Sequence, residues 1–116
     1  MASVKIIPAK LNYTIYRGDD FNAVMTIQEE GVAVDVSDRT YTAQLRRSPD
    51  GDVVEDFGID MTDAAAGDVG VILTDAVTAD LDGSYVWDFQ QETAGGVVRT
   101  LAGGQFTVTK DVTRAA

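Results

Sequence analysis

The amino-acid sequence predicts an all-β protein, a sandwich or a barrel of about seven or eight short strands. Apolar and polar residues alternate with a period of two in one segment after another, and alternate residues of a strand point to opposite faces of its sheet. Clusters of turn-forming residues separate these segments at short intervals. The predicted turns lie at residues 17–20, 29–31, 48–51, 94–96 and 103–104.

Each predicted strand contributes a row of apolar residues, and we expect every row to face a common core because large apolar side chains are mostly buried. In chain order the rows are Leu11, Tyr13 and Ile15; Phe21, Ala23, Met25 and Ile27; Tyr41, Ala43 and Leu45; Val53, Phe57, Ile59 and Met61; Val69, Val71 and Leu73; Tyr85, Trp87 and Phe89; and Val97 to Leu101 with Phe106, Val108 and Val112.

Helix is expected only in one or two short turns that connect strands. They lie at residues 75–82, with Thr74 as the cap and Gly83 as the end, and, as a weaker copy, at residues 62–67. Val77 and Leu81 are four residues apart, so both are expected to face inward.

Three aromatic residues, Tyr85, Trp87 and Phe89, occupy every second position of the stretch GSYVWDFQQ. Such a row lies on one face of a strand, where it either lines a ligand site or belongs to the core. A chain of 116 residues needs that face for its core, so we expect the rings to be buried. Asp88 lies on the opposite face and is expected to be solvated.

Length and composition exclude several classes of protein. A chain of 116 residues has the size of one domain. The absence of cysteine and histidine excludes disulfides, thiolate chemistry, imidazole catalysis and the common zinc sites. A formal charge of −10 and a pI of about 4.1 disfavour nucleic acid and anionic membranes as partners. No secretory signal and no bilayer-spanning apolar run are expected.

Two short motifs have well-known functional meanings. Arg17-Gly18-Asp19 spells the integrin-binding tripeptide, and Asn12-Tyr13-Thr14 is an N-glycosylation sequon. Glycine and aspartate are also what a tight turn between two strands uses, and the sequon falls within a predicted strand. We therefore expect a turn and a strand at these places.

Acidic residues gather in two loop regions: Asp50, Asp52, Glu55 and Asp56, and Asp80 with Asp82. Calcium needs about six to eight converging oxygens, and the spacing does not match an EF-hand loop. No carboxylate pair has the apolar setting of a glycosidase acid, and no serine has a histidine to activate it. The prediction is a non-enzyme without catalytic, cofactor-binding or metal-binding residues.

The order of segments resembles a small immunoglobulin-like domain that recurs in virion proteins of tailed bacteriophages, among minor tail proteins and at the front of baseplate upper proteins. The stretches that carry the resemblance cover nearly the whole chain after residue 15. They are YRGDDF (16–21), VDVSDRTYTAQLRRSPDGDVV (34–54), GDVGVILTDAVTADLDGSYVWDFQ (67–90) and GGVVRTLAGGQFTVTKDVTR (95–114).

This resemblance implies a single immunoglobulin-like antiparallel β-sandwich over residues 11–114, with residues 1–10 as an N-terminal arm or first strand. It implies a structural role, without catalysis, in a virion assembled in the bacterial cytoplasm. The partners would be other virion proteins, and the protein would be present in multiple copies within a symmetric assembly. Gly103 and Gly104 then suit a bulge or tight bend in the closing hairpin.

The N-terminal arm offers a contact element through Val4, Lys5, Ile6 and Ile7. These residues either add a strand to a neighbour's sheet or form the first strand of the same sandwich. Two further functions remain open. One is a capsid decoration protein. The other is a carbohydrate-binding module whose exposed stacking platform comes from Tyr13, Tyr16, Tyr41 or Trp87.

Overall fold

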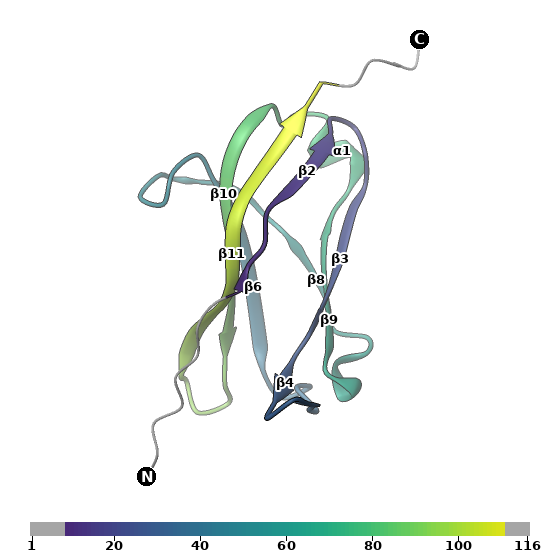
Figure 1. Ribbon diagram of the computed structural model, residues 1–116, viewed down its shortest axis with the longest axis vertical. Coiled ribbons are helices and arrows are strands. Elements are labelled where there is room, and N and C mark those ends of the chain that lie inside the picture. The colour runs from purple at the N-terminus through teal and green to yellow at the C-terminus, as the bar shows by residue number, and fades with distance from the viewer. Residues whose placement is uncertain (1–8, 111–116) are drawn as a thin grey trace.

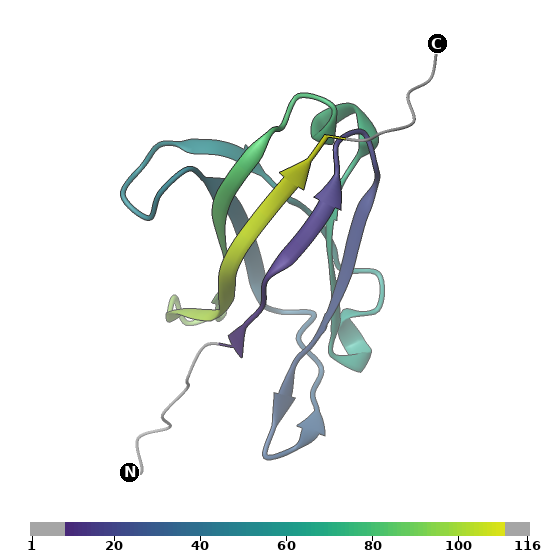
Figure 2. The same ribbon diagram turned by 45° about the horizontal axis from the view of Figure 1, so that its top comes forward.

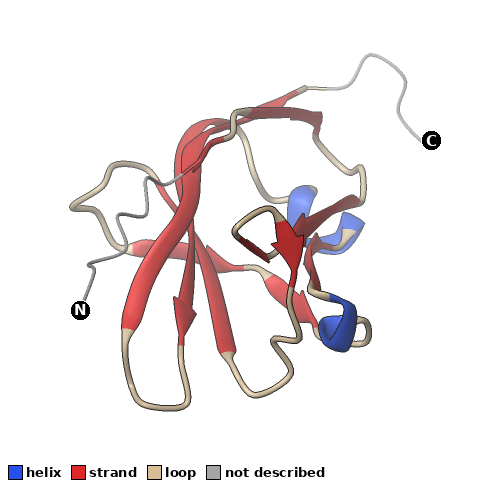
Figure 3. Cartoon of the chain, turned by 60° about the horizontal axis from the view of Figure 1, so that its bottom comes forward, coloured by secondary structure: helices blue, strands red, loops and turns tan. Residues whose placement is uncertain are grey.

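Strands make up most of the fold in the computed structural model, which describes residues 9–110, and helix is confined to short turns (Figures 1 and 3). Within that range the strands are β1 (Ala9–Lys10), β2 (Tyr13–Tyr16), β3 (Phe21–Thr26), β4 (Gln28–Glu29), β5 (Val32–Ala33), β6 (Thr40–Arg46), β7 (Val53–Asp56), β8 (Gly58–Asp60), β9 (Asp68–Leu73), β10 (Gly83–Glu92) and β11 (Val98–Thr109). The helical elements are the 3-10 turn η1 (Ala64–Ala66) and the helix α1 (Asp75–Thr78).

Two sheets pack face to face as a β-sandwich. The larger sheet has the order β1-β11-β10-β6-β7, with β2 also paired to β11, and the smaller has the order β3-β9-β8. The predicted all-β sandwich is confirmed. Its sheets are not purely antiparallel, because β1 and β2 run parallel to β11 (Figure 2).

The core lies between the two sheets and is rich in aromatic rings. Tyr85, Trp87 and Phe89 are 3%, 4% and 1% exposed, which confirms that the aromatic row of β10 belongs to the core. Phe106 from β11 and Phe21 from β3 meet across the sandwich at a centroid distance of 5.0 Å in an edge-to-face arrangement, the favoured geometry for such pairs.

The predicted row from Val53 to Met61 is not one strand. β7 pairs with β6 in the larger sheet, whereas β8 pairs with β9 in the smaller one. The chain crosses between the sheets at Phe57, whose side chain is buried and whose N–H donates to the Ala43 carbonyl at 2.9 Å. Val53 lies before the crossing on the edge strand and is 39% exposed, so its predicted place in the core is wrong.

The predicted closing bend at Gly103 and Gly104 is also wrong, because β11 runs continuously through both glycines. The bulge lies instead at Leu101, which is skipped where Phe89 pairs with Ala102 and Gln90 with Thr100. Gly104 serves a close approach: a Cβ there would collide with the Leu11 carbonyl, between β1 and β2.

Both predicted helical turns are present, with differences in detail. α1 ends at Thr78, and the Thr74 side chain makes no capping hydrogen bond. The Asp75 N–H donates instead to Asp20 Oδ1 at 2.7 Å, so a carboxylate from the connection between β2 and β3 caps the helix. Leu81 is buried as predicted, and the polar Thr78 is fully buried as well.

Some predictions concern residues outside the described range. The contact residues Val4, Lys5, Ile6 and Ile7 and the core residue Val112 all fall there. No helix within residues 9–110 is long and apolar enough to cross a membrane.

Candidate binding groove

The outward-facing residues of β10 form the centre of the larger sheet's outer face. Since side chains alternate along a strand, the burial of Trp87 inside places Val86 and Asp88 outside. The register sets Val86 between Arg46 of β6 and Gln105 of β11, and Asp88 between Gln44 and Gly103.

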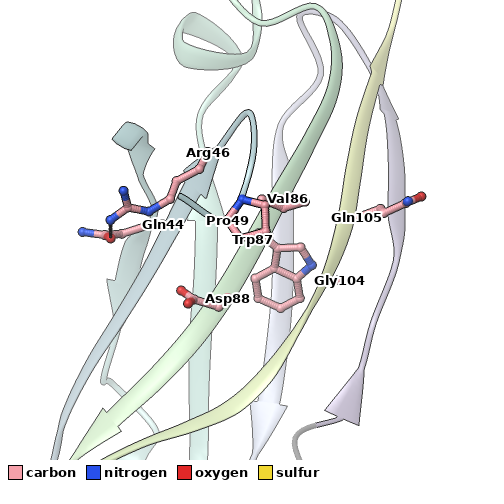
Figure 4. Close-up of a pocket in the computed structure, with 8 residues that line it drawn as sticks. All are labelled: Gln44, Arg46, Pro49, Val86, Trp87, Asp88, Gly104 and Gln105. Atoms are coloured by element: carbon pink, nitrogen blue, oxygen red, sulfur yellow. Dashed lines mark hydrogen bonds between the residues drawn. The ribbon is translucent and has the colours of Figure 1, made fainter. Parts of the chain in front are cut away.

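A groove of about 380 Å³ lies on this face, in the size range of small-ligand sites (Figure 4). Its lining comes from β6, β10, β11 and the loop after β6. The lining residues are Gln44, Arg46, Pro49, Val86, Trp87, Asp88, Gly104 and Gln105.

The groove is hollow because β11 carries glycines where it passes β10. Gly103 lies directly opposite Asp88 and leaves no side chain on the outer face beside it. The loop that carries Pro49 is tied to the sheet through Arg46, whose guanidinium donates to the Gly51 carbonyl and, at 2.9 Å, to Gln44 Oε1.

Asp88 is the acidic group of the groove, and its environment differs from the expected solvated one. Its side chain is partly buried, and burial raises the pKa of its carboxyl, against the opposing effect of the Arg46 charge. Among the described residues the Asp88 carboxylate has no hydrogen-bond partner. It forms no ion pair either, since the one salt bridge within those residues joins Arg39 to Glu29, away from Asp88.

A second polar cluster lies at the end of the aromatic row and is fully satisfied. The Gln91 side chain is 5% exposed, and its Oε1 accepts from the Tyr41 hydroxyl at 2.8 Å and from Arg39 at 3.1 Å. Burial raises the pKa of the Tyr41 hydroxyl. Arg39 also donates to Glu29 at 3.1 Å. Gln91 was missed, although it continues the period-two row of Tyr85 to Phe89.

The rings proposed as a carbohydrate platform lie mostly in the core. Tyr41 and Trp87 are 5% and 4% exposed, and the indole Nε1–H of Trp87 donates inward to the Leu11 carbonyl at 2.8 Å. Tyr13 packs partly buried against the core, whereas Tyr16 is exposed. Of these four rings, Tyr16 is the one that is exposed.

The two short motifs have structural roles. Arg17 and Gly18 form the turn between β2 and β3, with Gly18 at φ +88° and the Asp19 N–H donating to the Tyr16 carbonyl at 3.1 Å. The side chain of Asn12, the sequon asparagine, accepts from the Gln105 N–H at 2.9 Å. Between β1 and β2, this side-chain oxygen thus takes the place of a backbone carbonyl as the acceptor for β11.

The acidic residues of the loops do not converge. Over residues 9–110 no three acidic side chains lie close enough together to hold a metal ion. Within the groove, one carboxylate stands among amide, guanidinium and apolar groups, without a nucleophile or a second carboxylate. This arrangement suits binding of a cationic group better than acid–base or nucleophilic chemistry.

No protein-family model matches the chain, and no curated protein is significantly similar to it.

Proposed function

We propose that the chain is a structural protein of a tailed-bacteriophage virion, a minor tail or baseplate-associated component that binds other virion proteins. The order of its sequence segments supports this, and the β-sandwich is compatible with it. Its location would be the assembled particle.

The observation that carries an assembly role is the open edge of the larger sheet. β7 pairs with β6 on one side only and ends its sheet, and its Val53 and Val54 side chains are 39% and 42% exposed. Natural proteins usually protect such edges, and an extended segment of a partner can pair with them. Many identical copies would multiply a weak contact of this kind.

The N-terminal residues Val4, Lys5, Ile6 and Ile7 are candidates for the matching segment. Their sequence combines three apolar residues with one basic residue, whereas β7 and the loop before it are acidic through Asp50, Asp52, Glu55 and Asp56. Opposite charges favour the encounter of two such surfaces.

A capsid decoration protein is the alternative within the same class, because an acidic sandwich that binds through a sheet edge suits the outside of the head as well as the tail or baseplate. The carbohydrate-binding alternative has less support, since Tyr41 and Trp87 are buried.

Cryo-electron microscopy of the intact phage particle tests the proposal. Density for the sandwich on the tail or baseplate would support it, and density on the outside of the head would favour decoration. Quantitative mass spectrometry of purified particles gives the copy number. Absence of the chain from the particle by both methods would overturn the proposal.

A matched pair of variants tests the role of the edge. Val54→Lys places a charge on β7, and Val24→Lys makes the same change on the other sheet, where Val24 is 64% exposed. We expect V54K to reduce incorporation into particles and V24K to leave it unchanged. Equal incorporation of both would exclude β7 as the contact.

A further inference from the structure

The polar groups that line the groove are unequally engaged. The Arg46 guanidinium donates to Gly51 and Gln44, and Gln44 Nε2 donates to Asp56 Oδ1 at 3.0 Å. Within the described chain, the Asp88 carboxylate and the Gln105 side-chain amide have no such partner. The groove therefore presents an acceptor that is still open, whereas its one cation is already bound to neighbouring groups.

Apolar surface lies beside this open carboxylate. Val86 and Pro49 line the groove, and Gly104 contributes bare backbone next to Trp87. A lysine or arginine side chain has the same division, with an aliphatic stem that packs on apolar surface and a cationic head that seeks an acceptor. A cation beside a partly buried carboxylate gains a charge-assisted hydrogen bond.

We propose that this groove binds a basic side chain, lysine or arginine, that a partner protein presents to the outer face of the larger sheet. The net charge of −10 favours approach of a basic partner. An anionic ligand fits less well, because the Arg46 guanidinium is engaged and Asp88 would repel it. This proposal depends on the proposed assembly role in one respect: the lysine or arginine side chain is taken to come from a partner protein.

A titration on the isolated protein tests the site without any virion partner. The ¹⁵N-labelled chain is titrated with Nα-acetyl-lysine N-methylamide, with the arginine analogue, and with the norleucine analogue, which has an apolar side chain without the ammonium group. We expect saturable shifts at the amides of Val86, Asp88, Gly104 and Gln105. The indole N–H of Trp87, the single tryptophan, gives one further resolved signal.

The basic probes should bind with dissociation constants in the millimolar range, as expected for one side chain, and at least about tenfold more tightly than the norleucine probe. Asp88→Asn removes the charge at nearly constant shape and should weaken the basic probes at least about fivefold. Asp80→Asn, the same change on an exposed turn residue outside the groove lining, should change binding less than about twofold.

Three results would overturn the proposal: no saturable shift at the groove, equal binding of the norleucine probe, or equal effects of D88N and D80N. A dispersed spectrum of D88N shows that the variant is folded. These outcomes are separate from the particle experiment, because a chain found in the virion can still lack this pocket, and the pocket can exist in a protein that is not a virion component.

Discussion

The two faces of β10 differ in how completely their polar atoms are satisfied. On the inner face, Tyr85, Trp87 and Phe89 are almost fully buried, the indole N–H donates to Leu11 at 2.8 Å, and the Tyr85 hydroxyl accepts from the Asp82 N–H at 2.9 Å. On the outer face, Asp88 is partly buried, and within residues 9–110 its carboxylate has no hydrogen-bond partner. The inner face of β10 thus stabilises the fold, whereas its outer face carries the carboxylate of the proposed binding site.

Trp87→Ala is the largest test of this separation. It removes a ring that contacts Tyr13 and Phe57 at centroid distances of 5.5 and 6.0 Å and leaves the Leu11 carbonyl without its donor. We expect the free energy of unfolding to fall by about 3–5 kcal/mol. Urea denaturation followed by far-ultraviolet circular dichroism measures this loss without a tryptophan signal.

Val86→Ala is the control on the outer face of the same strand. Because Val86 is only partly buried, its truncation should cost about 1 kcal/mol or less. A cost equal to that of W87A would mean that the outer face is as tightly packed as the inner one, and the contrast between the faces would fail.

Gly104→Ala tests the close approach that holds the N-terminal strands on β11. The added methyl group would collide with the Leu11 carbonyl and lie 2.6 Å from Asn12 Oδ1. The backbone must shift, so we expect a loss of about 1–3 kcal/mol in urea denaturation. Gly95→Ala is the matched control, since the nearest atom to its Cβ is Thr93 Oγ1 at 3.9 Å. If the two alanines cost the same, the close approach does not contribute to stability.

The sequence predicted most inward rows correctly, because burial on one face of a strand leaves a period-two pattern that needs no tertiary information. It could not show that the chain changes sheets at Phe57, since both sides of the crossing continue the same alternation. The groove was missed for a related reason. Gly103, Asp88 and Gln44 are far apart in the chain, and only strand register brings them together.

Tyr41→Phe tests the satisfied polar cluster of the inner face. The change removes the hydroxyl that donates to Gln91 Oε1, while Arg39 still donates to the same oxygen at 3.1 Å. One buried hydrogen bond is lost, but Gln91 Oε1 keeps a donor, so we expect the free energy of unfolding to fall by about 1 kcal/mol.

Thr42→Val, on the exposed outer face of the same strand, should change the unfolding free energy by less than about 0.5 kcal/mol. Thermal and urea unfolding of both variants give the comparison. A neutral Y41F would indicate that the Gln91 cluster is not needed for stability.

Asp88→Asn has the smallest expected effect, and here the direction of the change in unfolding free energy matters more than its size. Burial raises the pKa of this carboxyl above its ordinary value of 3.8, so in the wild-type protein ionisation costs more in the folded than in the unfolded chain. The wild type therefore loses stability as the pH rises from 3.8 through the raised pKa, and the asparagine variant does not. At pH 7 we expect D88N to be the more stable protein, by less than about 1 kcal/mol because the carboxylate keeps contact with water.

That advantage of D88N should shrink as the pH falls toward 3.8. Asp35 and Asp60 have lowered pKa values, because Ser37 and Thr62 donate hydrogen bonds to them, and they destabilise the fold when protonated at low pH. Both proteins share these groups, so the difference between their unfolding free energies isolates Asp88. If D88N were instead less stable at pH 7, the attraction of Arg46 would outweigh burial, and the groove would hold a paired carboxylate with little left to offer a partner.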